Sequence, residues 1–172
     1  SILGGANVSD KLAVVRNLLD RVDEVLVGGA MAYTFLKAKG VEVGASRVEE
    51  DMLEECRSVL ADAEARGVTI LLPADHRCAR SFEADDARVM DGAIEDGWMG
   101  LDVGPQTEAL YAGRVGGAGT VVWNGPMGVF EWPAFAAGTR AVANAMARCP
   151  GTTVVGGGDS AAAMKLFDLR DQ

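Results

Sequence analysis

The chain has 172 residues, of which 49% are hydrophobic, and this size and composition favour a single globular domain. Its formal net charge of −9 and its pI near 4.6 argue against general nucleic-acid binding, which favours basic surfaces. No apolar run approaches the ~18–20 residues of a membrane span, and the N-terminus lacks the basic and apolar layout of a signal peptide.

The elements expected in chain order alternate between strands and helices. They are strand 1–3, helix 9–22, strand 25–27, helix 30–39, helix 48–66, strand 68–72, strand 98–103, helix 106–115, strand 120–123, helix 134–148 and strand 152–155. The polar, acid-rich residues 75–95 are expected to be irregular, as an excursion at the edge of the sheet. Strands that alternate with helices predict a parallel sheet covered on both faces. The expected fold class is therefore doubly wound α/β, a Rossmann-like three-layer domain over residues 1–172.

Few side chains outside the turns suggest chemistry. The acids of segment 48–66 fit a solvated helix face better than paired catalytic carboxylates. These acids are Glu49, Glu50, Asp51, Glu54 and Glu55. The three cysteines, Cys56, Cys78 and Cys149, contain no C-x-x-C pair and indicate free thiols in a reducing, cytoplasmic setting rather than a zinc site. His76 is the only histidine, and we expect it to have an ordinary structural or surface role.

Glycine-containing turns follow five of the predicted strands. These turns are residues 4–5, 28–29, 104–105, 124–126 and 156–158. In open α/β sheets, ligands bind beyond the carboxyl ends of the strands, where glycines expose the backbone to them. The alternative is that each glycine only serves its turn.

The last of these turns has the strongest individual signal. A strand ends at Val155, three glycines follow, and Asp159 and Ser160 open a helix of small residues. Backbone N–H groups and a helix N-terminus can hold phosphate, and Asp159 beside them suggests Mg²⁺ bound to a nucleotide. The alternative is a tight turn in which Asp159 only caps the helix.

Two nucleotide-binding motifs can be tested directly. No lysine follows a glycine as a P-loop requires. The dinucleotide pattern G-x-G-x-x-G/A is met formally by Gly156, Gly158 and Ala161, but the acid expected about 20 residues later would lie beyond Gln172. Dinucleotide binding is therefore a weak interpretation.

Five segments together resemble one family, phosphoglycerate kinase. They are residues 2–11 (ILGGANVSDK), 28–36 (GGAMAYTFL), 97–105 (GWMGLDVGP), 122–131 (VWNGPMGVFE) and 156–163 (GGGDSAAA). They occur in the family's order and span nearly the whole chain. The resemblance is to the family's C-terminal, nucleotide-binding domain.

The resemblance implies transfer of a phosphoryl group between 1,3-bisphosphoglycerate and ADP in glycolysis, giving 3-phosphoglycerate and ATP with Mg²⁺. It places Gly5, Ala6, Gly29, Ala30, Leu101, Asn124, Pro126 and Val129 around the adenine. It implies that Glu131 binds the ribose hydroxyls and that Lys11 binds a phosphate. Asp159 would ligate Mg²⁺, with Ser160 in the same turn, and the amides of Gly157 and Gly158 would face the transferring group.

The chain departs from the family at three points. Asn7 stands where the family has a lysine that stabilises the transferring phosphoryl charge, and Ala30 stands where a third glycine is usual. The phosphoglycerate-binding N-terminal domain and the last Gly-rich segment are also missing, so the domain is expected to be incomplete and inactive alone. The parent protein is expected to be a cytoplasmic monomer with no nucleic-acid or membrane partner. Two alternatives stay open, a nucleotide-binding module with impaired catalysis and a dinucleotide-binding domain.

Overall fold

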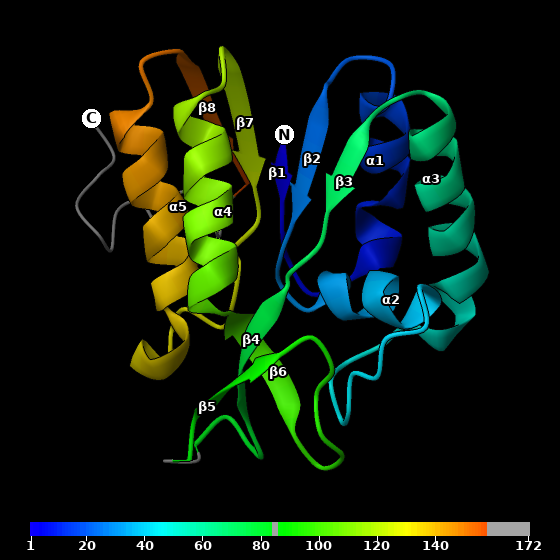
Figure 1. The fold of residues 1–172 in the computed structure, drawn as a ribbon, viewed down its shortest axis with the longest axis vertical. Helices are drawn as coiled ribbons and strands as arrows, with labels where there is room; N and C mark the ends of the chain where they lie inside the picture. The colour runs from blue at the N-terminus through cyan, green and yellow to red at the C-terminus, as the bar shows by residue number, and fades with distance from the viewer. Residues whose placement is uncertain (84–85, 158–172) are drawn as a thin grey trace.

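Five parallel strands form the central sheet of the structure, a computed structural model that describes residues 1–83 and 86–157. In spatial order they are β3 (Thr69–Leu71), β2 (Glu24–Val27), β1 (Ile2–Leu3), β7 (Thr120–Asn124) and β8 (Thr152–Gly156). The short strand β1 pairs with β2 on one side and with β7 on the other. All five strands run in the same direction, so their carboxyl ends lie at one edge, the lower one in Figure 1.

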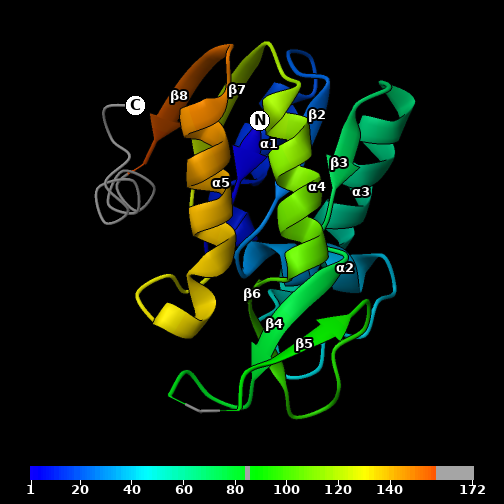
Figure 2. The same ribbon diagram turned by 60° about the vertical axis from the view of Figure 1, so that its left-hand side comes forward.

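Helices cover both faces of this sheet, which confirms the doubly wound α/β class (Figures 1 and 2). The helices are α1 (Leu12–Leu18), α2 (Met31–Ala38), α3 (Leu53–Ala65), α4 (Pro105–Gly116) and α5 (Ala137–Arg148), with short 3₁₀ turns η1 (Val8–Asp10), η2 (Glu50–Met52) and η3 (Pro133–Phe135). Leu3 packs into the core formed with α1, α2 and α3. Its neighbour Ile2 packs into the core formed with α4 and α5. The two cores thus follow the alternation of side chains along a strand.

A second, antiparallel sheet lies below the first in Figure 1, in the order β5-β4-β6. Its strands are β4 (Asp75–Ala79), β5 (Arg88–Asp91) and β6 (Met99–Val103). The expectation that residues 75–95 are irregular was therefore wrong for β4 and β5, and the strand predicted at 98–103 does not belong to the parallel sheet. The sequence of β4 does not indicate a buried strand, because Asp75 and His76 are polar although the structure buries them fully.

Buried polar groups in the second sheet are held by local partners. A ring nitrogen of His76, Nε2, lies 3.0 Å from the carbonyl oxygen of Gly92, and the ring lies 5.4 Å from that of Tyr33. Its other ring nitrogen, Nδ1, has no hydrogen-bond partner among the described residues. Burial lowers the pKa of His76 below its usual value of 6.5. His76 is therefore a buried side chain of the second sheet, so the surface position that the expectation left open is excluded.

The other sequence expectations differ from the structure in detail. The helix predicted at 48–66 begins at Leu53, after η2, and the helix predicted at 9–22 ends at Leu18. Four of the five acids assigned to a solvated face are exposed, and Glu49 is half-buried. The cysteines are free thiols. None of the helices among the described residues is long and apolar enough to cross a membrane.

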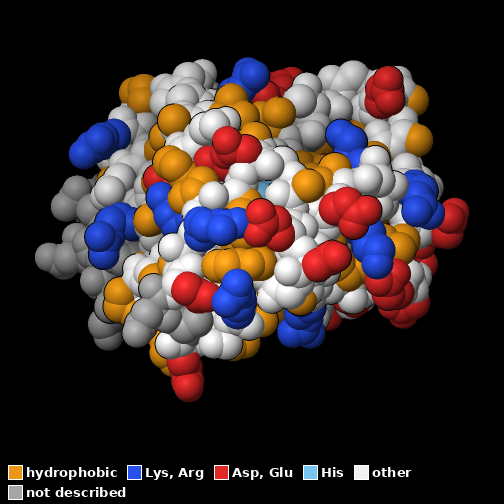
Figure 3. Space-filling view, turned by 60° about the horizontal axis from the view of Figure 1, so that its bottom comes forward, with side chains coloured by type: hydrophobic (Ala, Val, Ile, Leu, Met, Phe, Trp, Pro, Cys, Tyr) orange, Lys and Arg blue, Asp and Glu red, His pale blue; other side chains and the backbone are white. Residues whose placement is uncertain are grey.

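Charges of both signs alternate over the face that includes the lower end of the molecule (Figure 3). The second sheet and the loops beside it form ion pairs, including Arg88 with Glu95 and Arg80 with Asp86. Arg80 and Arg88 also lie over the ring of Trp98, at 4.8 and 4.9 Å from its centre. Neither sign forms a continuous patch on the visible part of this face.

Candidate functional site

A hollow of about 360 Å³ lies where β1 and β7 end, at the carboxyl edge of the central sheet. Its lining consists of Gly4, Gly5, Ala6, Asn7, Asp10, Lys11, Asn124, Gly125, Pro126 and Gly157. Ligands of open α/β sheets bind at this edge. Three of the five glycine turns singled out from the sequence contribute to the lining.

The glycines of the hollow have two different roles. Gly4 and Gly125 let two loops pack backbone against backbone, because a Cβ on either would overlap a carbonyl oxygen of the other loop. Gly125 also has φ of +101°, a conformation that side chains disfavour. Gly5 is different, since the nearest atom to an added Cβ would be the Lys11 Cε, 3.9 Å away. Gly5 therefore has open space beside its Cα, while Gly4 and Gly125 serve packing.

Lys11 places a positive charge in this hollow. The residue precedes the first turn of α1, and its Nζ donates a hydrogen bond of 2.6 Å to Oδ1 of Asn124, at the end of β7. The same oxygen lies 2.8 Å from the position of a Cβ on Gly157, beyond the end of β8. Asn124 lies between the ends of β1 and β8, since it pairs with Leu3 and with Gly156. The ammonium group gives this part of the hollow a positive charge, which favours an anion.

Asn7, the residue at the family's lysine position, is tied into a small polar cluster. Its Nδ2 donates to Oδ2 of Asp10 at 3.2 Å. Its Oδ1 accepts a hydrogen bond of 2.6 Å from Nη2 of Arg47, in the loop between α2 and η2. The hollow therefore has a cation beside its Asn7 side as well as its Asn124 side.

The loop at 125–131 connects the hollow to the remaining candidate residues. The Gly5 N–H donates to the carbonyl of Pro126 at 3.2 Å, and the Gly29 N–H donates to that of Met127 at 3.0 Å. The Val129 N–H donates to the carbonyl of Leu101 at 2.9 Å, at the second sheet. One loop thus gathers segments that are far apart in the sequence.

Not every predicted site residue lines the hollow. The five that lie outside its lining are Gly29, Ala30, Leu101, Val129 and Glu131. Leu101 and Val129 pack together with Phe135, whereas Glu131 is exposed. Gly158, Asp159 and Ser160 lie outside the described residues, so the predicted metal ligand is not placed. Among residues 1–83 and 86–157, no group of three or more His, Cys, Asp or Glu side chains could hold a metal ion.

Comparison with known proteins decides the family. The family model for phosphoglycerate kinase matches residues 1–172. The chain belongs to the phosphoglycerate kinase family. It is 57% identical to the phosphoglycerate kinase of Clostridium botulinum (strain Alaska E43 / Type E3) and 56% identical to that of Anaeromyxobacter dehalogenans (strain 2CP-C). Each alignment covers 100% of this chain and 44% of the relative.

Solved phosphoglycerate kinase structures share the fold. The structure from Coxiella burnetii is matched with a TM-score of 0.95 and 43% identity, over 99% of this chain and 44% of that one. The structure from Pyrococcus horikoshii OT3 gives a TM-score of 0.85 and 33% identity, over 96% and 43%. The chain thus spans less than half the length of these phosphoglycerate kinases. Family membership favours the kinase interpretation over the dinucleotide-binding one.

One buried carboxylate next to the candidate residue Leu101 was not singled out from the sequence. Asp102 follows Leu101 on β6 and accepts hydrogen bonds of 2.9 Å from the N–H groups of Val103 and Gly138. Burial raises the pKa of Asp102 to about 7, although the Gly138 N–H and the nearby Arg77 guanidinium act in the opposite direction. Asp102 therefore joins the second sheet to the start of α5.

Two close approaches fix Asp102 further. A Cβ on Gly128 or Gly138 would overlap its carboxylate or come within 2.5 Å of it. The Arg77 Nη1 lies 3.6 Å from Oδ2 and also bonds to Glu108. In the sequence, only the glycines in loop 125–131 and at the start of α5 could have indicated this cluster. They look like ordinary turn or helix glycines.

Asp75 is a second buried acid without a signal in the sequence. Its carboxylate accepts hydrogen bonds of 2.9 Å from the N–H groups of Gln106 and Thr107, in the first turn of α4. The Thr107 hydroxyl donates to the same carboxylate at 2.6 Å. An acid at a helix N-terminus satisfies amides that have no partner within the helix. Asp75 thus attaches α4 to the second sheet.

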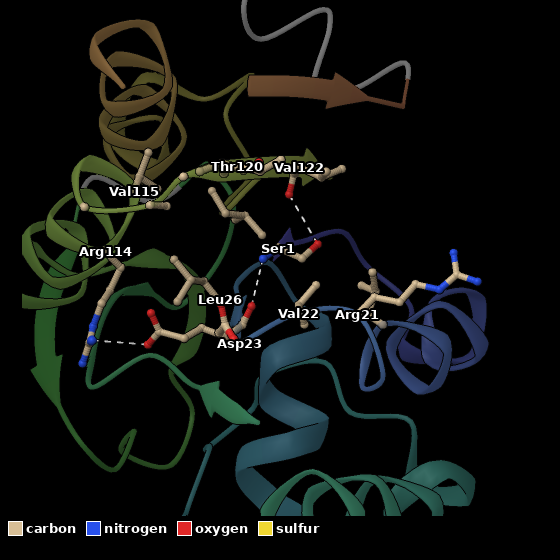
Figure 4. Close-up of a pocket in the computed structure, with 16 residues that line it drawn as sticks. Ser1, Arg21, Val22, Asp23, Leu26, Arg114, Val115, Thr120 and Val122 are labelled. Carbon is tan, nitrogen blue, oxygen red and sulfur yellow. Dashed lines mark hydrogen bonds and ion pairs between the residues drawn. The ribbon is translucent and has the colours of Figure 1, made fainter. Parts of the chain in front are cut away.

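A larger hollow, of about 580 Å³, lies at the opposite edge of the central sheet, between β2 and β7 (Figure 4). Leu26 and Val115 contribute apolar walls, and the Ser1 ammonium donates to the carbonyl of Glu24 at 2.8 Å. Arg114 pairs with the Glu24 carboxylate at 3.3 Å. None of the predicted site residues lines this hollow, which is therefore not the candidate nucleotide site.

Proposed function

We propose that the chain forms the nucleotide-binding half of a phosphoglycerate kinase. In the complete protein it would hold ADP or ATP while a phosphoryl group moves between 1,3-bisphosphoglycerate and the nucleotide, in glycolysis. The observation that carries the proposal is the hollow at the ends of β1 and β7. Lys11 and Asn124 both line this hollow, and the Lys11 ammonium donates a hydrogen bond to Asn124. Family membership supports the reaction.

The proposed binding mode divides the nucleotide between two surfaces. The Lys11 ammonium and the backbone beside Gly5 would hold the phosphates, because a point charge and backbone N–H groups both favour anionic oxygens. The apolar side chains of Leu101 and Val129 would face the adenine, since they already form one packed group. The exposed carboxylate of Glu131 would accept hydrogen bonds from the ribose. The amides of Gly157 and Gly158 would face the transferring group.

The described lining of the hollow offers few oxygen ligands for Mg²⁺, so the ion would have to bind mainly to the nucleotide phosphates. Its side-chain oxygens are those of Asn7, Asp10 and Asn124, and the Asn7 and Asn124 amide oxygens already accept hydrogen bonds from cations. Bound Mg²⁺ would neutralise charge on the phosphate oxygens. We assign its protein ligand to Asp159, outside the described residues, while Lys11 and the backbone bind and orient the phosphates.

Transfer requires more than this half. The relatives are more than twice as long as this chain. We assign the phosphoglycerate site to the part of those proteins that this chain does not cover. We therefore expect residues 1–172 alone to transfer no phosphoryl group, because closure over the nucleotide, which excludes water, would need that further part. The free thiols of Cys56, Cys78 and Cys149 fit the reducing cytoplasm, which we assign as the location of a monomeric parent.

Calorimetric titration of MgADP and of adenosine into this chain tests the proposal, with circular dichroism as the fold check. We expect saturable binding of MgADP, and we expect Lys11→Ala to weaken it about 10-fold, the loss of one charge-assisted hydrogen bond. Lys39→Ala is the matched control, since Lys39 is exposed at the end of α2 and outside the lining. Folded chain that does not bind MgADP would contradict the proposal.

A further inference from the structure

Arg47 places a second cation at the edge of the hollow. Its Nη2 donates to Oδ1 of Asn7 at 2.6 Å, and Asn7 is part of the lining. This contact uses one of the five N–H donors of a guanidinium group. The remaining donors lie in the same rigid plane, and a guanidinium group can bind a phosphate through two of them.

The loop that carries Arg47 is anchored on both sides of this residue. The Ser46 hydroxyl accepts a hydrogen bond of 2.9 Å from the Gly100 N–H, and this serine is buried. The Glu49 N–H donates to the hydroxyl of Thr34 at 3.1 Å, in α2. With contacts one residue before and two residues after it, the backbone of Arg47 has a defined position beside the hollow.

The charges around the hollow leave the guanidinium available for a ligand. Among the described residues, no ion pair within 4.0 Å involves Arg47, which is exposed. Two acids are bonded to this region: Asp10 accepts from Asn7, and the Oε1 of Glu49 accepts from the Ser9 N–H at 3.2 Å. Without the charge of Arg47, a phosphate beside Asn7 would be repelled by the carboxylate of Asp10.

We propose that Arg47 is a phosphate-binding residue of this site, and that its guanidinium and the Lys11 ammonium hold the nucleotide phosphates from two sides. Asn7 is then a positioning residue, because its amide oxygen holds the guanidinium at the edge of the hollow. This inference rests on the proposed function, since it assigns a further contact to the same nucleotide. It also supplies positive charge where Asn7 itself brings none.

Titrations with two ligands separate this contact from the rest of the site. MgADP and adenosine are titrated into the unmodified chain, Arg47→Ala, Arg47→Lys and Arg21→Ala, each with circular dichroism as the fold check. Arg21→Ala makes the same charge change at the opposite hollow, whose lining includes Arg21. We expect Arg47→Ala to weaken the binding of MgADP about 10-fold and to leave the affinity for adenosine unchanged. We expect Arg47→Lys to recover part of the loss and Arg21→Ala to change neither affinity.

Each other result would overturn the inference. Equal MgADP affinity of Arg47→Ala and the unmodified chain would show that Arg47 does not contact the phosphates. If Arg47→Ala weakened the binding of MgADP and of adenosine equally, Arg47 would have a structural role. A folded, unmodified chain that binds neither ligand would instead refute the proposed function, and the Arg47 contact with it.

Discussion

Replacing Asp102 with asparagine changes a carboxylate that is fully buried between β6 and α5. In the folded chain, burial raises the pKa of this carboxyl to about 7, from an ordinary value of 3.8. An acid with a raised pKa binds its proton more tightly in the folded state than in the unfolded state. Its contribution to stability is therefore complete below pH 3.8 and is lost as the pH rises through 7. The side-chain amide of the variant does not titrate, so the substitution removes this dependence.

The size of the effect follows from the pKa difference. About three pKa units at 1.36 kcal/mol each give at most about 4 kcal/mol between pH 4 and pH 8. Against this, Asp102→Asn replaces one acceptor of the Val103 and Gly138 N–H groups with an NH₂ group, which costs about 1–3 kcal/mol at every pH. From pH 5 to pH 8 about two of these pKa units remain, so the free energy of unfolding of the variant should rise by about 3 kcal/mol relative to that of the unmodified chain.

Urea unfolding at pH 5, 6, 7 and 8 measures this difference directly. Each measurement compares Asp102→Asn with the unmodified chain at the same pH, so that the titration of His76 cancels. Glu64→Gln is the matched control, because this exposed acid on α3 gives the same charge change. Parallel stability profiles of the unmodified chain and Asp102→Asn would refute the reasoning, since they would show that Asp102 titrates alike in the folded and unfolded states.

Two further predictions concern the second sheet and the hollow. Burial lowers the pKa of His76, so the contribution of His76 to stability should be lost as the pH falls below 6.5. The melting temperature of the unmodified chain should therefore fall relative to that of His76→Gln as the pH is lowered from 7 to 5, and a constant difference would exclude His76 as the cause. Gly125→Ala should destabilise by roughly 2–4 kcal/mol in urea unfolding, because its φ is +101° and its Cβ would overlap the Gly4 carbonyl. Gly113→Ala in α4, with open space around its Cβ, should stabilise by about 0.5–1 kcal/mol, and equal effects at the two glycines would contradict this account.

The central sheet could be predicted from the sequence because its strands are buried on both faces. A run such as Val25, Leu26 and Val27 is apolar throughout, and each of the three is buried in the structure. β4 could not be predicted in this way. Asp75 and His76 are as buried as the valines, but their burial depends on partners at Gln106 and Gly92 that no local pattern shows.

The residues of the candidate site likewise include some that the sequence predicted and some that it did not. The glycine turns and the family resemblance led to Lys11 and Asn124, which the structure brings into contact. Arg47 and Asp102 were missed because their contacts join residues 40 and 36 positions apart, and neither stands in a turn that suggests a ligand.

The two-residue strand β1 has a consequence for how the chain folds. It is the middle strand of the sheet, and it alone joins β2 and β3 to β7 and β8. Ser1 and Val122, which meet at this junction, are separated by 121 positions along the chain. Forming it requires closure of a very long loop, whereas β2, β3 and the helices between them assemble from nearby residues. The part built around β2 and β3 can therefore form first, and the sheet is complete only when β7 and β8 have joined it through β1.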